Sequence, residues 1–279
     1  MNAPAARTMA PPNAAPPVPG RVSAALGDLA DGARQWPQWF TLGNLEIRLR
    51  FRRTGLGPLW TSLSFAVLLA ALGFVYARVL AVDPRTYVPY LALGLLAWNF
   101  AATMLQEACE LYIHAAHTLK QLCVPKTVFL YRLLWRNLVL LALNAAVAAA
   151  ALALCRARIG PSALLALPGL ALLSLNLLWV GLLLALAGAR FWAASRAVQA
   201  ALPIAMLVTP VIWRPGTPAL AALARWNPLY WAVELVRGPL TGAPPAPLAW
   251  AGAAGAALAG TAVALILFAR LRERLLYWL

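Results

Sequence analysis

Few side chains in this chain of 279 residues could act as an acid or base or bind a metal ion. Asp and Glu together number eight, and there are two His. Glu107 and Glu110 lie three residues apart, so on a helix they share one face, where they could act as a base or hold a cation. Lys120, Lys126 and Arg132 follow closely in the sequence. We therefore interpret the two carboxylates as part of an ion-pair cluster at a membrane surface.

The histidines and cysteines give weak support for a metal site. His114 and His117 also share a helix face, but no third ligand stands near them. The cysteines have neither the spacing of a zinc site nor a CxxC pair, and we interpret them as small apolar residues. They are Cys109, Cys123 and Cys155. We predict no metal and no cofactor in this chain.

Common enzyme motifs are absent from the sequence. There is no GxxxxGK[ST] phosphate-binding loop, so the chain cannot hydrolyse ATP by that route alone. HExxH, GxSxG and a DxD-like acidic pair are also absent. A membrane-embedded enzyme that acts on glycans stays open as an alternative, with Glu107, Glu110 and Glu234 as its weak candidates.

The composition is typical of an integral membrane protein. Hydrophobic residues make up 63% of the chain and charged residues 11%, and the mean hydropathy is +0.74. A soluble domain carries about 25% charged residues. The net charge of +15 could indicate nucleic-acid binding, but the basic residues cluster at the ends of apolar runs. Lipid headgroups and the positive-inside rule explain that distribution better, so we predict contacts with membrane lipid and none with nucleic acid.

The stretch 48–60 marks the point where the chain enters the membrane. Four arginines stand before the first long apolar run, and Gly55, Gly57 and Pro58 then let the backbone turn. The arginines are Arg48, Arg50, Arg52 and Arg53. Arginines directly before a span favour the cytoplasmic side of the membrane.

The segment before this corner has the pattern of an amphipathic helix. From Trp36 to Phe51 apolar residues recur every three or four positions, and Glu46 and Arg50 lie on a different face at a spacing that favours an ion pair. We predict an interface helix over residues 34–55 that lies along the membrane surface. The Ala- and Pro-rich residues 1–33 are expected to form a disordered or weakly ordered cytoplasmic tail, with a short helix over Val22–Asp31.

Six apolar runs follow, and a bilayer crossing needs roughly 20 residues. They cover residues 58–79, 90–111, 128–154, 164–187, 198–213 and 248–269. We predict an all-α integral membrane protein whose domain over residues 56–279 holds six transmembrane helices, the fifth short and interrupted by Pro203 and Pro210. Residues 218–242 are apolar but broken by prolines, so we expect short re-entrant helices at the outer surface between spans five and six.

Six crossings place both chain ends on one side of the membrane. Most of the 23 basic residues then lie on that side. The basic residues on the other side are Arg78, Arg85, Arg156, Arg158, Arg214, Arg225 and Arg237. Because cytoplasmic segments carry an excess of Lys and Arg, we predict that both termini are cytoplasmic. Residues 112–126 would then be a cytoplasmic connection that could lie across the membrane surface and face a cytosolic protein.

Polar and aromatic residues inside the spans leave two interpretations open. Asn144 and Asn176 are expected to make hydrogen bonds between helices. The aromatic residues form either an interfacial belt or a conduit along which rings stack on sugars, and the sequence does not separate these two. The candidate conduit aromatics are Tyr76, Tyr87, Tyr90, Trp98, Trp213, Trp226 and Tyr230.

Five short motifs occur in order from the membrane corner to the C-terminus. They are RRTGLGPLW at 52–60, PYLALGLLAW at 89–98, LKQ and VPK within 119–126, WNPL and ELVR within 226–237, and RLLYWL at 274–279. Together these motifs resemble those of the permease subunits of type-2 ABC exporters for polysaccharides and polyol phosphates, such as O-antigen and capsule exporters. The resemblance covers about residues 36–279.

The resemblance implies a homodimer of six-span subunits above two separate ABC ATP-binding subunits, which bind ATP and Mg²⁺. It implies that a lipid-linked polysaccharide of the O-antigen or capsular type crosses the bacterial cytoplasmic (inner) membrane. It also implies that the interface helix and residues 112–125 receive the motion of the ATPase. The expected coupling residues are Trp39, Glu46, Arg50, Arg53, His114, His117, Lys120, Gln121 and Lys126. The candidate contacts for a pyrophosphate or lipid headgroup are Arg48, Arg52 and Arg53.

One position departs from the family pattern. Members of that family carry an acidic residue soon after the Arg-Phe pair that ends span four, whereas Arg190 and Phe191 are followed here by WAASR. The ion pair that this acid would make is therefore not expected. A permease of the same architecture that carries teichoic acid, a drug or a smaller lipid is the alternative reading of the motifs.

Overall fold

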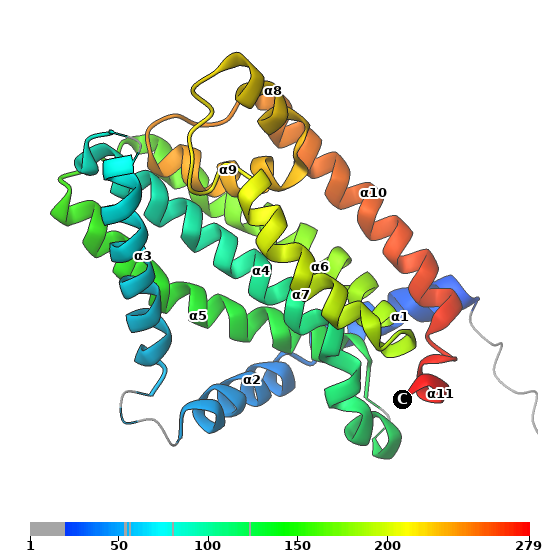
Figure 1. Ribbon diagram of the computed structural model, residues 1–279. Helices are drawn as coiled ribbons and strands as arrows, with labels where there is room; N and C mark the ends of the chain where they lie inside the picture. The colour runs from blue at the N-terminus through cyan, green and yellow to red at the C-terminus, as the bar shows by residue number, and fades with distance from the viewer. Residues whose placement is uncertain (1–19, 53–54, 56, 80, 123) are drawn as a thin grey trace, which may run out of the picture.

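A computed structural model describes residues 20–52, 55, 57–79, 81–122 and 124–279, and the regular elements among them are all helices. Figure 1 shows α4 running through the middle of the bundle, where α3, α5 and α6 pack on it, while α10 packs on α6. The long helices are α3 (Leu59–Val79), α4 (Pro84–Gln121), α5 (Thr127–Leu154), α6 (Ala166–Arg190) and α10 (Pro247–Leu271). The shorter ones are α1 (Arg21–Arg34), α2 (Trp36–Phe51), η1 (Pro161–Leu165), α7 (Ala193–Val208), α8 (Pro218–Trp226), α9 (Pro228–Leu240) and α11 (Leu275–Trp278).

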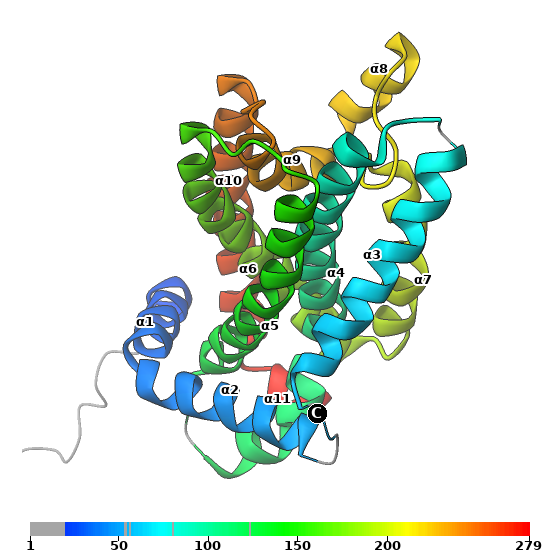
Figure 2. The same ribbon diagram turned by 90° about the vertical axis from the view of Figure 1, so that its left-hand side faces the viewer.

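The helices alternate in direction, so the bundle has two distinct ends. Figure 2 shows α2, α11 and the last turns of α4 at one end, here called the α2 end. The short helix α8 lies at the opposite end, here called the α8 end. The start of the described chain and its C-terminus both lie toward the α2 end, which is the arrangement that an even number of crossings produces.

Five helices in the described part of the chain are long and apolar enough to cross a membrane, and the shorter apolar helix α7 stands where the fifth of six spans was predicted. The all-α membrane fold is thus confirmed. The predicted fifth span, 198–213, is wrong at both ends. With 16 residues, α7 is about 24 Å long and ends at Val208, because Pro210 follows and the chain turns there.

The central helix α4 is longer than predicted. It runs without a break for 38 residues, about 57 Å, whereas the sequence suggested a span over 90–111 and a separate connection over 112–126. Residues 112–121 contain no Gly or Pro, so nothing ends the helix before Val124-Pro125. The expected surface connection is therefore mostly the end of α4, which projects at the α2 end.

The N-terminal helices fold onto the bundle. The short helix predicted over Val22–Asp31 is present as the longer α1, which packs on α5 and α10, while residues 1–19 of the predicted tail lie outside the described residues. Asp28 accepts hydrogen bonds from the backbone N–H and the hydroxyl of Thr127, both 3.0 Å away, and so caps the start of α5 from another helix. The helix α2 lies across the end of the bundle and packs on α5 (Figure 2), close to the predicted bounds 34–55.

Two short helices connect α7 to α10, as predicted. Each begins at a capping residue followed by proline: Thr217 accepts from the backbone N–H of Leu220, and Asn227 accepts from that of Leu229. The second helix, α9, packs on α4, α6 and α10, and its side chains from Val233 onward are largely buried.

Candidate functional site

Five charged side chains from three helices form one ionic network at the α2 end. Glu46 of α2 contacts Arg132 of α5 at 2.9 Å and Arg136 of α5 at 2.6 Å. Arg136 also contacts Glu107 of α4 at 2.7 Å, and Glu107 contacts Arg50 of α2 at 2.9 Å. This ionic network therefore joins the surface helix α2 to both α4 and α5.

The predicted ion-pair cluster is present, but with other partners. Among the described residues neither Lys120 nor Lys126 joins the network, and Glu46 and Arg50 each pair with another helix rather than with each other. The tertiary fold decides this, because α2 lies against α5 with Gly43 over the Trp135 ring, where a Cβ would stand 2.8 Å from a ring carbon.

Arg50 differs from the other members of the network. Its side chain is 53% exposed, whereas the other four are between 15% and 29% exposed. Glu107 accepts Arg50 on Oε1 and accepts both Arg136 and Asn137 on Oε2. With three arginines and two glutamates, the network carries one positive charge in excess.

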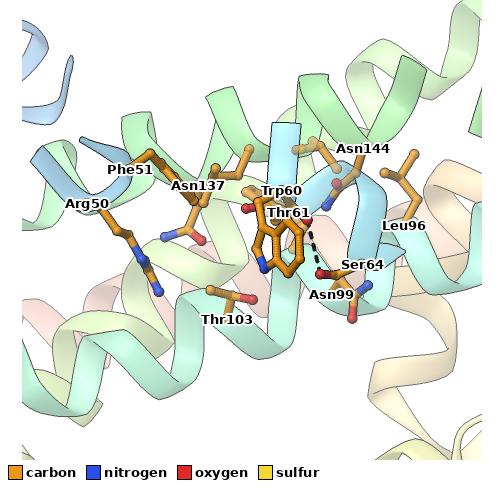
Figure 3. A pocket seen from close by; sticks show the side chains of 13 residues that line it. Arg50, Phe51, Trp60, Thr61, Ser64, Leu96, Asn99, Thr103, Asn137 and Asn144 are labelled. Atoms are coloured by element: carbon orange, nitrogen blue, oxygen red, sulfur yellow. Dashed lines mark hydrogen bonds between the residues drawn. The ribbon is translucent and has the colours of Figure 1, made fainter. Parts of the chain in front are cut away.

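A cavity of about 370 Å³ lies next to the ionic network, between α3, α4 and α5. Figure 3 shows Arg50 and Phe51 on one side of it, with Trp60 between Arg50 and Asn144 in this view. Each of the three helices contributes polar side chains to its wall. They are Thr61 and Ser64 from α3, Asn99 and Thr103 from α4, and Asn137 and Asn144 from α5.

A second cavity, of about 540 Å³, also borders the network. Glu46, Glu107, Arg132 and Arg136 line it, and Arg50 and Thr103 line both cavities. Arg50 therefore stands at the boundary between the two spaces.

Glu110 belongs to a separate contact between α4 and α7. Its Oε1 accepts the Ser195 hydroxyl at 2.6 Å, and its Oε2 lies 3.2 Å from His114. His117 instead pairs with Gln121, at 3.2 Å. Among the described residues no group of three or more His, Cys, Asp or Glu side chains could hold a metal ion.

A second arginine–glutamate cluster, here called the Arg237 cluster, lies toward the α8 end and consists of Tyr90, Glu234 and Arg237. Arg237 is 1% exposed and contacts Glu234 at 2.6 Å. Its guanidinium lies 3.9 Å from the centre of the Tyr90 ring and donates to the Pro210 carbonyl at 2.7 Å. In the sequence Arg237 stands out as an outer basic residue and as part of the ELVR motif, and its spacing of three from Glu234 is the signal that could have indicated the pair.

Residues 37–240 match the sequence pattern of the ABC-2 type transporter family, from the start of α2 to the end of α9. The chain belongs to this family. It is therefore a multi-pass transport permease, the membrane subunit of an ABC transporter, rather than a catalytic subunit. Membership implies association with ABC ATP-binding subunits. No curated protein sequence matches the permease.

The candidate coupling residues of the permease fall into two groups. His114, His117, Lys120 and Gln121 are exposed on the projecting end of α4. Trp39 turns inward instead, with its ring 6.3 Å from that of Trp135. Together with Glu46 and Arg50 it fixes α2 to the bundle.

Lys126 and the corner arginines complete the predicted interface. Lys126 is half-buried beside α1, where burial lowers its pKa and the nearby Arg272 lowers it further. Arg48 and Arg52, predicted to contact a headgroup, are exposed, and Arg53 lies outside the described residues.

Three of the seven candidate conduit aromatics are held inside the permease subunit. Tyr87 is 0% exposed and donates its hydroxyl to the Ile212 carbonyl at 2.7 Å, and Trp98 is buried in the core. Tyr90 is covered by Arg237 and Arg214. In these positions the three rings pack against the protein or hydrogen-bond with it, and their role in a conduit stays a prediction.

The other candidate aromatics are nearer the surface. Trp226 is 88% exposed. Tyr76 is partly buried against the core, Trp213 donates its ring N–H to the Leu207 carbonyl, and Tyr230 lies 5.1 Å from the Trp231 ring. Trp60, which the conduit list omitted, lines the polar cavity instead.

Proposed function

We propose that this ABC-2 permease exports a lipid-linked polysaccharide across the bacterial inner membrane, as a homodimer driven by two separate ABC ATP-binding subunits that bind ATP and Mg²⁺. The observation that carries the proposal is the position of the ionic network. It joins a helix at the bundle surface to two bundle helices at the wall of a polar cavity.

The α2 end has the parts that an ATP-driven subunit needs to receive motion. The projecting end of α4 presents exposed His114, His117 and Lys120, and α2 lies beside it across the end of the bundle. Because the ionic network connects α2 to α4 and α5, a push on α2 moves the wall of the polar cavity. We accordingly assign the α2 end, and with it both termini, to the cytoplasm, in line with the excess of basic residues there.

The chemistry of the cavity favours a glycan over an apolar cargo. Amide and hydroxyl groups from three helices line it, beside the Trp60 ring and apolar side chains such as Leu96, Phe100 and Leu140. Such groups hydrogen-bond sugar hydroxyls, and an aromatic ring covers the apolar face of a sugar. A drug or a small lipid offers few hydrogen-bonding partners for these amide and hydroxyl groups. Teichoic acid, which also carries hydroxyls and phosphates, stays the nearest alternative.

The carboxylates that an enzyme would need are already occupied. Glu107 accepts three donors, Glu110 is held by Ser195 and His114, and Glu234 is paired with Arg237. A general base must lie within hydrogen-bond reach of the proton that it abstracts, and here bonds to neighbouring side chains hold the three carboxylates in place instead. This supports transport over a glycan-handling reaction.

The test is ATP-dependent translocation in inverted membrane vesicles that contain the permease and its co-purified ATP-binding subunits. A lipid-linked polysaccharide should become protected inside the vesicles when ATP is added. A partner whose phosphate-loop lysine is replaced serves as the control and should give no protection. Protection without ATP, or recovery of the permease without any ATP-binding subunit under gentle solubilisation, would contradict the proposal.

The coupling surface has its own test. Lys120→Glu on the exposed end of α4 should reduce co-purification of the ATP-binding subunits, and Arg225→Glu at the α8 end should not. Equal recovery of these subunits with both variants would remove the end of α4 from the interface.

A further inference from the structure

Asn144 places a buried amide oxygen at the wall of the cavity between α3, α4 and α5. It is 8% exposed, and within the described structure its Oδ1 atom has no hydrogen-bond partner. A buried polar group in this state costs about 1–3 kcal/mol, and native proteins leave few of them. Asn176, the other asparagine expected to join helices, does bond across to the Ala253 carbonyl, at 3.1 Å. For Asn144, by contrast, Oδ1 makes no interhelical bond among the described residues.

The Asn144 side chain belongs to a row of polar groups that line the same cavity. Asn137 and Asn144 are seven residues apart, two turns along the same face of α5. On α4, Asn99 and Thr103 are spaced four apart and face the same space. In otherwise apolar helices, polar stripes that converge on one cavity indicate a hydrated space or a polar ligand. The volume of about 370 Å³ lies at the lower end of ligand sites, which range over about 300–1,000 Å³, and suits a single headgroup rather than a polymer.

Arg50 stands at the cavity's boundary with a bond that it can give up. Its half-exposed side chain holds Glu107 through Oε1 alone, while Arg136 and Asn137 occupy Oε2. If Arg50 turns away, Glu107 therefore stays paired. A phosphate that enters the cavity can bind the Arg50 guanidinium, whose planar donors match phosphate oxygens. The excess positive charge of the ionic network attracts it as well.

We propose that this cavity binds the phosphate-linked first sugar of the exported lipid, with Asn144 hydrogen-bonding the sugar and Arg50 exchanging Glu107 for a phosphate oxygen. This inference rests on the proposed function and names the site within it. The exchange opens the direct contact between α2 and α4, while Glu46 still ties α2 to Arg132 and Arg136 of α5. Occupancy of the cavity thereby changes how α2 is held, and α2 lies where the ATP-binding subunits are expected.

The experiment measures binding of a short lipid-pyrophosphate-linked oligosaccharide to the whole complex, permease with ATP-binding subunits, in phosphatidylcholine nanodiscs. Asn144→Leu should weaken binding about 3- to 10-fold, and Arg50→Gln about 10-fold or more, because the second bond is charge-assisted. The melting temperature of the empty complex should stay the same or rise with Asn144→Leu, since the variant removes an unpaired buried oxygen. A purely structural asparagine would lower it.

Asn176→Leu is the matched control. It removes an asparagine whose bond to Ala253 lies within the protein, so it should lower the melting temperature and leave cargo affinity unchanged. Wild-type affinity in the Asn144→Leu complex overturns the cavity site while leaving polysaccharide export in place. A wild-type complex that neither binds nor translocates the lipid-linked glycan overturns the proposed function itself.

A second lipid composition separates the cargo from ordinary membrane lipid. Phosphatidylglycerol also carries a phosphate and hydroxyls, so the measurement is repeated in nanodiscs that contain it. Cargo affinity should change less than about twofold, because Asn144 hydrogen-bonds the sugar, which phosphatidylglycerol lacks. Loss of binding in these nanodiscs would show a general site for anionic headgroups and would overturn the proposal.

Discussion

The two arginine–glutamate clusters of this permease differ in what surrounds them. In the Arg237 cluster one buried guanidinium is fixed on every side, by Glu234, by the Pro210 carbonyl and by the Tyr90 ring. In the ionic network at the α2 end, three arginines share two carboxylates between two cavities, and Arg50 is half exposed. Arginine and glutamate thus form a rigid contact toward the α8 end and an exchangeable contact at the α2 end.

The difference follows from the cost of leaving a charge without a partner. Removal of one member of a buried pair strands the other in a low-dielectric interior, which costs about 3–5 kcal/mol. A shared and partly exposed network loses less, because Glu107 keeps two donors when Arg50 leaves. Substitution in the Arg237 cluster is therefore expected to lower mainly the stability of the permease. Substitution of Arg50 at the α2 end is expected to lower mainly its transport activity.

The largest effect is expected from Arg237→Met. It strands Glu234 and releases the Pro210 carbonyl, so the permease should lose about 3–5 kcal/mol of stability. Thermal denaturation of the purified complex measures this loss as a lower melting temperature. The control is Arg214→Gln, which removes the exposed guanidinium from the Tyr90 ring and should have a much smaller effect. Equal melting temperatures for the two variants would show that the Arg237 cluster does not stabilise the permease more than the exposed Arg214 contact does.

Arg136→Met should have the next largest effect, about 2–3 kcal/mol, because Glu46 keeps Arg132 and Glu107 keeps Arg50. Adding Glu107→Gln should cost less than the sum of the single changes, by about 1–2 kcal/mol, since the two side chains contact each other. Melting curves of the four proteins complete this cycle. Strict additivity would mean that the contact contributes nothing to stability.

Gly94→Ala tests the space that the Arg237 cluster needs. A Cβ at this position would stand 3.1 Å from Nη1 of Arg237 and 3.1 Å from the Val211 carbonyl oxygen. Moving a fixed guanidinium to make room should cost about 1–3 kcal/mol. Gly252→Ala, where nothing lies within 4 Å, is the control and should leave the melting temperature unchanged or raise it slightly. An equally harmless Gly94→Ala would indicate that Arg237 is mobile.

The smallest loss of stability is expected from Arg50→Gln, under about 1 kcal/mol, since the side chain is half exposed. Translocation should nevertheless fall strongly, because the residue borders both cavities. Melting temperature and ATP-dependent translocation are measured on the same preparation. Arg34→Gln, which breaks the exposed pair with Asp31 at 3.7 Å, is the control for a lost surface arginine and should leave both quantities unchanged. A drop in melting temperature as large as that of Arg136→Met would place Arg50 in a rigid contact.

Several elements of the fold were predictable because they depend on local sequence. Apolar runs indicated the membrane helices, and Asn227 followed by Pro228 marks the start of one of the two short helices near the α8 end. The continuous α4 could also have been predicted, since residues 112–121 lack a helix breaker. The interpretation of 112–126 as a separate connection gave their polarity more weight than the absence of Gly and Pro.

Other features depend on which helices meet, and no local pattern decides that. The spacing of Glu46 and Arg50 on α2 is compatible with a pair, but the packing of α2 on α5 turns Glu46 toward Arg132 and leaves Arg50 to Glu107. The order of residues 21–34 likewise depends on contacts with α5 and α10.

The sequence alone determined the class of this protein, the approximate positions of its helices and the residues able to carry charge or bind phosphate. Helix geometry repeats every 3.6 residues, so faces and caps can be read locally. The tertiary structure decided which charges pair, that Tyr87 is buried, and that Asn144 lines a cavity with an Oδ1 atom that has no partner among the described residues. Those outcomes depend on contacts between residues far apart in the chain, because burial and pairing follow from how the helices pack against one another.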